Sequence, residues 1–173
     1  MPQRSVSTGV SGVGAPQTLT GEGMQIRLAR TTDAAAINEL LHQLGYPQVG
    51  AATTAIRIKT WGDDLSSAAY VADADGDILG LVAVHVCPFF ERTGSWGRIV
   101  ALIVDDQARG EGVGGQLVTA AESFATSRGC VRMEVTSGDH RRGAHEFYRR
   151  RGYLDQAGRS SRFLCDLDDT TRS

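Results

Sequence analysis

The spacing of hydrophobic residues alternates along the chain between the period of a strand and the period of a helix. After a short β-rich run at 26–30, apolar residues recur every three to four positions. This pattern predicts an amphipathic helix that begins at Thr32 or Asp33 and ends at Gly45. A polar loop separates it from a second short helix, which is expected at 53–61.

The middle of the chain has the pattern of strands. Apolar and β-branched residues fill the runs 68–74 and 78–87, which are joined by Asp-Gly-Asp at 75–77. An Asp-Gly pair between two such runs is a strong hairpin signal, so these strands are expected to pair antiparallel. The next run, 96–104, is almost continuously apolar toward its end, as in a buried central strand.

The last third of the chain combines both periods. Its first helix carries apolar residues at helical spacing and is closed by Gly129. The elements expected here are the helices 112–128 and 141–151 and the strands 130–136, 153–154 and 161–167. The complete order is β, α, α, β, β, β, α, β, α, β. Because it joins an antiparallel hairpin to a strand–helix–strand crossover, we predict an α/β (α+β) fold with a mixed sheet.

Chain length favours one folded domain with short tails. The 173 residues can form one core but are few for two. No repeat or linker interrupts 24–167, which we expect to be a single domain. Residues 1–23 are rich in Ser, Thr and Gly and lack the features of a secretory signal, so a disordered tail is expected there, and a second tail at 168–173. Met1 and Met24 both stay open as the translation start.

Charge and cysteine content narrow the classes of function. The net charge of -2 and the pI near 6.1 argue against a nucleic-acid-binding protein. The apolar runs are too short to cross a membrane, so no membrane association is expected. The three cysteines lack the spacing of a disulfide framework or a metal site, which favours a reducing cytoplasm and no metal. Between Arg98 and Arg162, eleven arginines face eight acidic residues, which suits a ligand that carries phosphate.

A glycine-rich loop lies between the apolar strand 96–104 and the helix that follows it. Its sequence, starting at Arg109, is Arg-Gly-Glu-Gly-Val-Gly-Gly. At the start of a helix, unpaired amides and the helix dipole stabilise an anion, and glycines let that anion approach the backbone. We therefore predict a loop that binds pyrophosphate.

Two other phosphate-binding motifs fit this loop less well. A nucleotide P-loop needs a lysine and a hydroxyl after its last glycine, where this chain has Gln116 and Leu117. The dinucleotide fingerprint is formally matched by Gly110, Gly112 and Gly115. However, these glycines begin five residues after the strand, and too few residues follow to complete a doubly wound sheet.

The loop and two other segments together resemble the GNAT superfamily of N-acetyltransferases. Arg109, Gly112 and Gly114 fit the cofactor motif of that family, Gln/Arg-x-x-Gly-x-Gly/Ala. The preceding segment 102–105 and the later segment 144–153 are similar to the end of its fourth strand and to its second motif. The joint occurrence of the three is more specific than a glycine loop alone.

The resemblance implies a cofactor core over 96–151, splayed between its two strands, with acetyl-coenzyme A in the gap. The pantetheine arm would run along the first strand like an extra strand, and the loop amides would hold the pyrophosphate. The residues implied in cofactor binding are Leu102, Ile103 and Val104 on the strand, Arg109, Gly110, Glu111, Gly112, Val113, Gly114 and Gly115 in the loop, and Tyr148.

Acetyl transfer to an amine needs a neutral nucleophile, stabilisation of the oxyanion and a proton for the departing thiolate. The resemblance implies that a main-chain amide near Val104 stabilises the oxyanion and that Tyr148 is the acid. Tyr148 also shares a helical face with Ala144 and Phe147, so core packing stays an alternative for it.

The general base stays open, because the glutamate that this family often carries early in the strand 96–104 is missing. Glu91, His85 and Glu134 are candidates, and a water relay is another. The residues expected to border the acceptor amine are the loop 46–52, Phe89, Phe90 and Trp96.

Together these observations predict an acetyl-CoA-dependent N-acetyltransferase. It would act on a primary amine of a small molecule or peptide by direct attack, without a covalent acetyl-enzyme. No metal ion is implied, and a homodimer is compatible with the sequence. The missing glutamate motivates an alternative, a catalytically silent module that senses acyl-CoA.

Overall fold

The computed structural model describes residues 23–165 and residue 167. The disordered tail expected at 1–23 therefore lies outside the described residues, apart from Gly23, and so does the tail expected at 168–173. Among the helices of the described residues, none has the length and apolar character needed to cross a membrane.

The chain divides into two compact units, one that ends at Val135 and one that begins at Thr136. The first unit contains a β-sheet with three α-helices, and the second contains one α-helix. The single domain expected over 24–167 stays a prediction.

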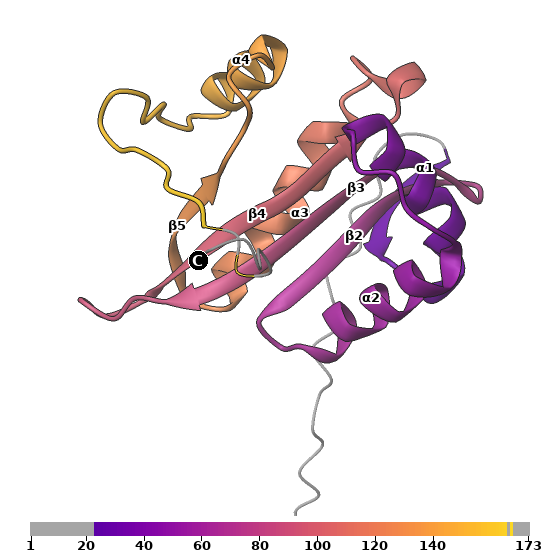
Figure 1. The fold of residues 1–173 in the computed structure, drawn as a ribbon, viewed down its shortest axis with the longest axis horizontal. Coiled ribbons are helices and arrows are strands. Elements are labelled where there is room, and N and C mark those ends of the chain that lie inside the picture. The colour runs from indigo at the N-terminus through magenta and orange to yellow at the C-terminus, as the bar shows by residue number, and fades with distance from the viewer. Residues whose placement is uncertain (1–22, 166, 168–173) are drawn as a thin grey trace, which may run out of the picture. The chain divides into compact units, whose positions relative to one another are not determined.

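The first unit is built on a mixed five-stranded sheet (Figure 1). Its strands are β1 (Met24–Leu28), β2 (Ser67–Ala74), β3 (Asp77–Pro88), β4 (Ser95–Val104) and β5 (Cys130–Val135). They lie in the order β1-β2-β3-β4-β5. The first four pair antiparallel, whereas β4 and β5 pair in parallel. The predicted mixed sheet is confirmed.

The turn between β2 and β3 shows why the hairpin could be predicted. Asp75 and Gly76 both have positive φ, 52° and 102°. This combination is typical of the two-residue turn whose twist matches that of the flanking strands, and Asp-Gly is among the pairs that form it most readily. The antiparallel pairing of β2 with β3 follows from this local preference.

The helices also follow the predicted order. They are α1 (Ala34–Leu44), α2 (Ala51–Asp63), α3 (Val113–Ser127) and α4 (Arg142–Arg150), with short 3-10 turns η1 (Thr31–Asp33) and η2 (Asp106–Ala108). Helix α1 ends where predicted, at Gly45, which has a left-handed φ of 98°. Such a residue terminates a helix without the strain that a side chain would bring.

Helices cover both faces of the sheet (Figure 1). Helix α3 packs so closely on one face that a Cβ added at Gly80 would lie 2.9 Å from the Leu117 side chain. On the other face, α1 and α2 bury a cluster that includes Ile37 and Ile58 together with Leu81 of β3. The interleaved hydrophobic residues of the sequence therefore point alternately into these two layers.

The second unit corrects one expectation. The strands predicted at 153–154 and 161–167 are absent from its described residues, which form irregular chain and turns after α4. A strand needs a neighbour for its backbone hydrogen bonds and an apolar surface for alternate side chains. Instead, Phe163 is 90% exposed and Leu164 is 76% exposed. The segment has apolar residues, but its described residues form no strand with a neighbour in their own unit.

Candidate active site

The second half of β4 has no strand on its β5 side. β5 pairs with β4 from Ser95 to Ile99, and the pairing stops there although β4 continues to Val104. The register with β3 shifts at the same place, which leaves Val100 as an extra residue of β4. A bulge of this kind bends a strand and increases its twist. The arrangement agrees with the predicted splay between the two strands.

The open edge of β4 presents the main-chain amides of Leu102 and Val104. The Asp105 N–H donates to the Leu79 carbonyl at 2.9 Å, so it points toward β3. Because successive amides of a strand point to opposite sides, the Ile103 amide also faces β3, and those of Leu102 and Val104 face the open side. Two of the three strand residues predicted to bind pantetheine thus have amides on the open edge.

The chain passes from β4 to α3 through a loop with two left-handed glycines. Gly110 and Gly112 have φ values of 89° and 84°, which residues with a side chain rarely adopt. A Cβ added at either position would meet no atom within 4 Å, so both glycines border open space. Substitution here would be limited by backbone strain and by whatever ligand occupies that space.

Three amides at the start of α3 are left without a helical acceptor. The first hydrogen bond of the helix runs from the Gln116 N–H to the Gly112 carbonyl at 3.2 Å. The N–H groups of Val113, Gly114 and Gly115 precede it, at the positive end of a 15-residue helix. Amide donors, the helix dipole and open space beside the glycines suit a pair of linked phosphates.

Arg109 and Glu111 are exposed on the same loop. The Arg109 guanidinium contacts the Asp106 carboxylate at 2.5 Å, and both side chains are more than 60% exposed. An ion pair this exposed contributes little to stability, so the guanidinium can exchange its partner for a ligand phosphate at small cost.

Gln43 of α1 forms hydrogen bonds to the start of the connection between β4 and α3, and the sequence analysis did not identify it. Its Nε2 donates to Asp105 Oδ2 at 3.0 Å, and its Oε1 accepts from the Asp106 amide at 3.3 Å. Hydrogen bonds from Gln43 and from the Gln107 amide hold the pKa of the Asp105 carboxyl below its ordinary value. A glutamine inside a helix gives no local signal that it will meet a loop sixty residues later.

Tyr148 lies in the second unit, on α4, where it is buried. Its ring centroid lies 5.2 Å from that of Phe147 and 5.5 Å from that of Tyr153. Burial raises the pKa of the Tyr148 phenol to about 12, although the positive charge of Arg141 acts in the opposite direction. The phenol is therefore fully protonated near neutral pH.

The three candidate bases have different surroundings. Glu91 is exposed in the turn between β3 and β4. Glu134 of β5 accepts a hydrogen bond from Arg98 at 3.2 Å. His85 of β3 lies with its Nδ1 2.9 Å from Ser67 Oγ. Among the described residues, Nε2 of His85 has no hydrogen-bond partner.

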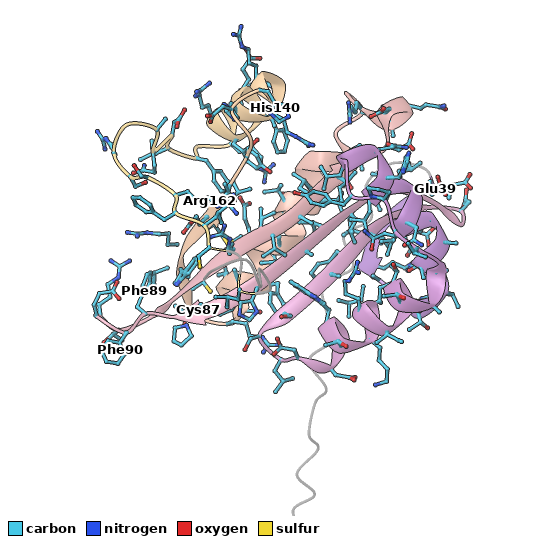
Figure 2. The ribbon with its side chains drawn as sticks, in the orientation of Figure 1. Glu39, Cys87, Phe89, Phe90, His140 and Arg162 are labelled. Atoms are coloured by element: carbon cyan, nitrogen blue, oxygen red, sulfur yellow. The ribbon has the colours of Figure 1, made fainter. Side chains whose placement is uncertain are left out.

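The residues expected to border the acceptor are dispersed. Figure 2 shows Phe89 and Phe90 near the tip of the β3–β4 hairpin, and β4 leads from that tip toward the glycine loop. Phe90 is fully exposed, whereas the Phe89 ring has the Arg92 guanidinium 4.0 Å from its centroid. In the loop that precedes α2, Val49 is 94% exposed.

Comparison with known proteins places the chain in a family. The acetyltransferase (GNAT) family model matches residues 35–153. An uncharacterized N-acetyltransferase of Bacillus subtilis, YhfO, is 31% identical over 141 residues, which cover 78% of this chain and 93% of that protein. The aminoalkylphosphonate N-acetyltransferase of Salmonella typhimurium is 33% identical over 91 residues, or 52% of this chain and 58% of that protein.

Solved structures show the same fold. The glucosamine-6-phosphate N-acetyltransferase of Arabidopsis thaliana superposes with a TM-score of 0.71 at 22% identity, over 85% of this chain and all of the other. The enzyme AAC(6')-Iy, solved with a bisubstrate analogue of coenzyme A, superposes with a TM-score of 0.71 at 18% identity, over 83% of this chain and 97% of its own.

A match over more than half of the chain defines the class of the protein, which is an acyltransferase. More narrowly, the chain belongs to the acetyltransferase (GNAT) family and is an N-acetyltransferase. The family resemblance and the enzyme class predicted from the sequence are both confirmed.

Proposed function

We propose that the protein transfers the acetyl group of acetyl-CoA to a primary amine of a small molecule or peptide by direct attack. The observation that carries this proposal is the continuity of two features. The open edge of β4 at Leu102 and Val104 is followed, after η2 and the glycine loop, by the start of α3, where three amides precede the first helical hydrogen bond. One feature suits the amide groups of a pantetheine arm, and the other suits a pyrophosphate.

Acetyl-CoA would supply an activated thioester, and the chain would hold it through its backbone. The amides of the loop from Arg109 to Gly115 bind the pyrophosphate, with the Arg109 side chain as a further donor. The edge of β4 aligns the pantetheine arm. The Val104 amide, or that of Leu102 on the same edge, stabilises the negative charge that develops on the carbonyl oxygen.

Tyr148 is proposed to donate a hydrogen bond to the departing sulfur. Its pKa of about 12 lies well above the reference value for a thiol, about 8.5, so complete proton transfer to a thiolate would cost roughly 5 kcal/mol. The phenol therefore acts by donating a hydrogen bond while it keeps its proton. The thiol takes its proton in the end from the attacking nitrogen.

Replacing Tyr148 by Phe is expected to lower kcat by about 10- to 100-fold while coenzyme A affinity stays within about threefold. A hydrogen bond to a charged group contributes about 1.5–3 kcal/mol, and this one forms as the sulfur becomes negative. Steady-state kinetics and calorimetric titration with coenzyme A measure the two quantities. Tyr70→Phe, which removes a hydroxyl from another partly buried tyrosine, is the control. Equal loss of affinity and turnover in Tyr148→Phe would contradict this role.

Gly112→Ala is expected to weaken coenzyme A binding by about 10-fold or more, because its methyl group enters the space proposed for the pyrophosphate. Gly129→Ala is a matched control at the other end of α3, since Gly129 also has a positive φ, 74°, and open space around its Cβ position. Both variants should lose about 1–2 kcal/mol of unfolding free energy through backbone strain. Equal coenzyme A affinity in the two variants would argue against a phosphate site at Gly112.

The acceptor is proposed to be a small amine, in line with relatives named for aminoalkylphosphonate and glucosamine-6-phosphate. The test is release of free thiol from acetyl-CoA with a panel that contains aminoalkylphosphonates, phosphorylated amino sugars, aminoglycosides, polyamines and peptide N-termini. Amine-dependent thiol release is the expected result. Tight binding of acetyl-CoA without turnover on any of these amines would instead favour the silent sensor.

A further inference from the structure

Four polar residues form a row across the sheet close to the place where β4 leaves β5. Ser67, His85, Arg98 and Glu134 are direct register partners on β2, β3, β4 and β5. Direct partners lie on the same face of a sheet. We call these four residues the polar row.

The polar row lies on the accessible face of the first unit. Gly97, next to Arg98, faces α3 so closely that an added Cβ would lie 2.9 Å from Ala125. Arg98 and its row partners therefore face the opposite side. There the side chains of His85 and Glu134 are 46% and 47% exposed, so α1 and α2 do not cover them.

The hydrogen bonds around His85 define which of its nitrogens can take a proton. Ser67 Oγ lies 2.6 Å from Asp64 Oδ2 and 2.9 Å from His85 Nδ1. The pKa of Asp64 is lowered, first by this hydrogen bond from Ser67, so the carboxylate is ionised and Ser67 must donate its one proton to it. The hydroxyl oxygen then accepts from His85, which carries its proton on Nδ1 and leaves the lone pair of Nε2 available.

The neighbouring members of the polar row are less suited to accept a proton. Glu134 already accepts a hydrogen bond from the Arg98 guanidinium at 3.2 Å. The Arg98 guanidinium has N–H donors only and no acceptor atom. His85 combines an available lone pair with a neighbour of negative charge, Asp64 Oδ2, 3.8 Å from its Nδ1.

The distance from His85 to the open edge fits a path through water. Val82 is the register partner of Leu102, and His85 lies three residues further along β3, which corresponds to about 10 Å. The residues between them on this face, Ala83 and its partner Ala101, are small and partly exposed. An amine placed over these alanines would lie between the open edge of β4 and the imidazole.

We propose that His85 is the general base, a catalytic residue that removes a proton from the acceptor ammonium, and that Ser67 and Asp64 are positioning residues that orient its ring. This inference rests on the proposed acetyl transfer. It selects His85 from the candidates that the sequence left open, which are Glu91, His85, Glu134 and a water relay.

The acceptor enters as an ammonium group, R–NH3+, and one N–H bond breaks as its proton passes, directly or through one water, to Nε2 of His85. The neutral amine then forms the N–C bond while the C–S bond breaks. The second proton lost by the nitrogen ends on the thiol, and the imidazolium, being exposed, returns its proton to solvent. Asp64 stabilises the imidazolium through Ser67.

The charged groups that face His85 come from three elements. Asp64 follows α2, Arg98 lies beside His85 on β4, and Glu134 on β5 pairs with Arg98. Arg128, at the end of α3, acts on Asp64 from further away. Ser67 on β2 is neutral. A pH profile of His85 variants therefore reports on this set together.

The decisive experiment compares wild type with His85→Gln, using the best amine found by thiol release, from pH 6 to pH 10. We expect kcat/KM for the amine to fall about 30-fold at pH 7, less than for a directly placed base because water intervenes. The loss should shrink to within about threefold near pH 10, where about half of an amine of pKa about 10 is already neutral without a base. The affinity for coenzyme A should stay unchanged. A loss that is the same at every pH would overturn the proposal.

Variants of the neighbours test the positioning role. Ser67→Ala should lose part of the same pH-dependent activity, about threefold to fivefold at pH 7. Ser67→Thr, which keeps the hydroxyl, should retain wild-type rates, and Glu134→Gln is a control in the same row. If Ser67→Ala and Ser67→Thr behave alike, the relay through Ser67 is wrong. If wild type binds coenzyme A but no tested amine causes release of thiol, the proposed function fails and this inference fails with it. If wild type turns over and His85→Gln turns over equally well, the inference alone is refuted.

Discussion

Arg109→Glu is expected to weaken coenzyme A binding by at least about 100-fold, which corresponds to about 2.7 kcal/mol. The substitution removes a charge-assisted hydrogen bond worth about 1.5–3 kcal/mol and places a carboxylate beside the proposed pyrophosphate. The new carboxylate would also lie near Asp106, the present partner of Arg109. Calorimetric titration with coenzyme A measures the effect.

The fold itself should tolerate this change, because Arg109 and Asp106 are both exposed and their ion pair contributes little to stability. Arg57→Glu, at an exposed arginine of α2 that donates to Gln48, is the matched charge reversal away from the loop. It should leave coenzyme A affinity within about twofold, since screening removes most interactions beyond about 10 Å. Similar losses of affinity in the two variants would indicate a general effect of net charge.

Local signals explain why most of the fold could be predicted from the sequence. Gly45 ends α1 and the Asp75–Gly76 turn joins β2 to β3, and in both cases the positive φ that the backbone needs is nearly specific to a few residue types. The apolar run of β4 likewise predicts a strand, and the helical spacing of apolar residues in α3 predicts a helix. Each of these elements is specified by residues that are close in sequence.

The interior of the site depends on pairings that no local pattern reveals. The direction of the Leu102 and Val104 amides follows from the register of β4 on β3, and a shift by one residue would exchange them with that of Ile103. Likewise, His85 acquires its Ser67 partner through strand pairing across 18 residues. The glycine loop could be predicted because its function resides in the backbone, whereas these side-chain relations arise from tertiary structure.

The missing strand at 161–167 illustrates the opposite limit. Its apolar residues, Phe163 and Leu164 among them, favour a strand locally, but a strand also needs hydrogen bonds from a neighbour. The described residues of this segment form no strand and therefore no ladder of backbone hydrogen bonds, and Phe163 remains exposed. A run of apolar residues therefore indicates that a segment could form a strand, and it does not establish that a neighbouring strand is there to pair with it.

Arg27→Met is expected to lower the free energy of unfolding by about 3–5 kcal/mol, because it leaves two carboxylates in poorly solvated positions without their cation. Arg27 Nε lies 2.6 Å from Asp73 Oδ2, and its two terminal nitrogens contact Asp33 at 2.7 and 2.9 Å. The side chains of these residues are 14%, 11% and 8% exposed. Chemical denaturation at pH 7 measures the loss. Lys59→Met breaks an ion pair of similar length that is 68% exposed, and it should cost less than about 1 kcal/mol.

The same network should make the contribution of Arg27 depend on pH. Hydrogen bonds from Arg27 lower the pKa of Asp33 and of Asp73 from 3.8, against the opposing effect of burial. A carboxyl whose folded pKa is depressed stabilises the fold above its unfolded pKa, and this contribution disappears as the pH falls through the folded value. Wild type should therefore lose stability below about pH 4, whereas in Arg27→Met protonation relieves two unpaired charges, so the two unfolding curves should converge. Curves that stay parallel from pH 7 to pH 3 would show that Arg27 stabilises the protein by packing and not through its charge.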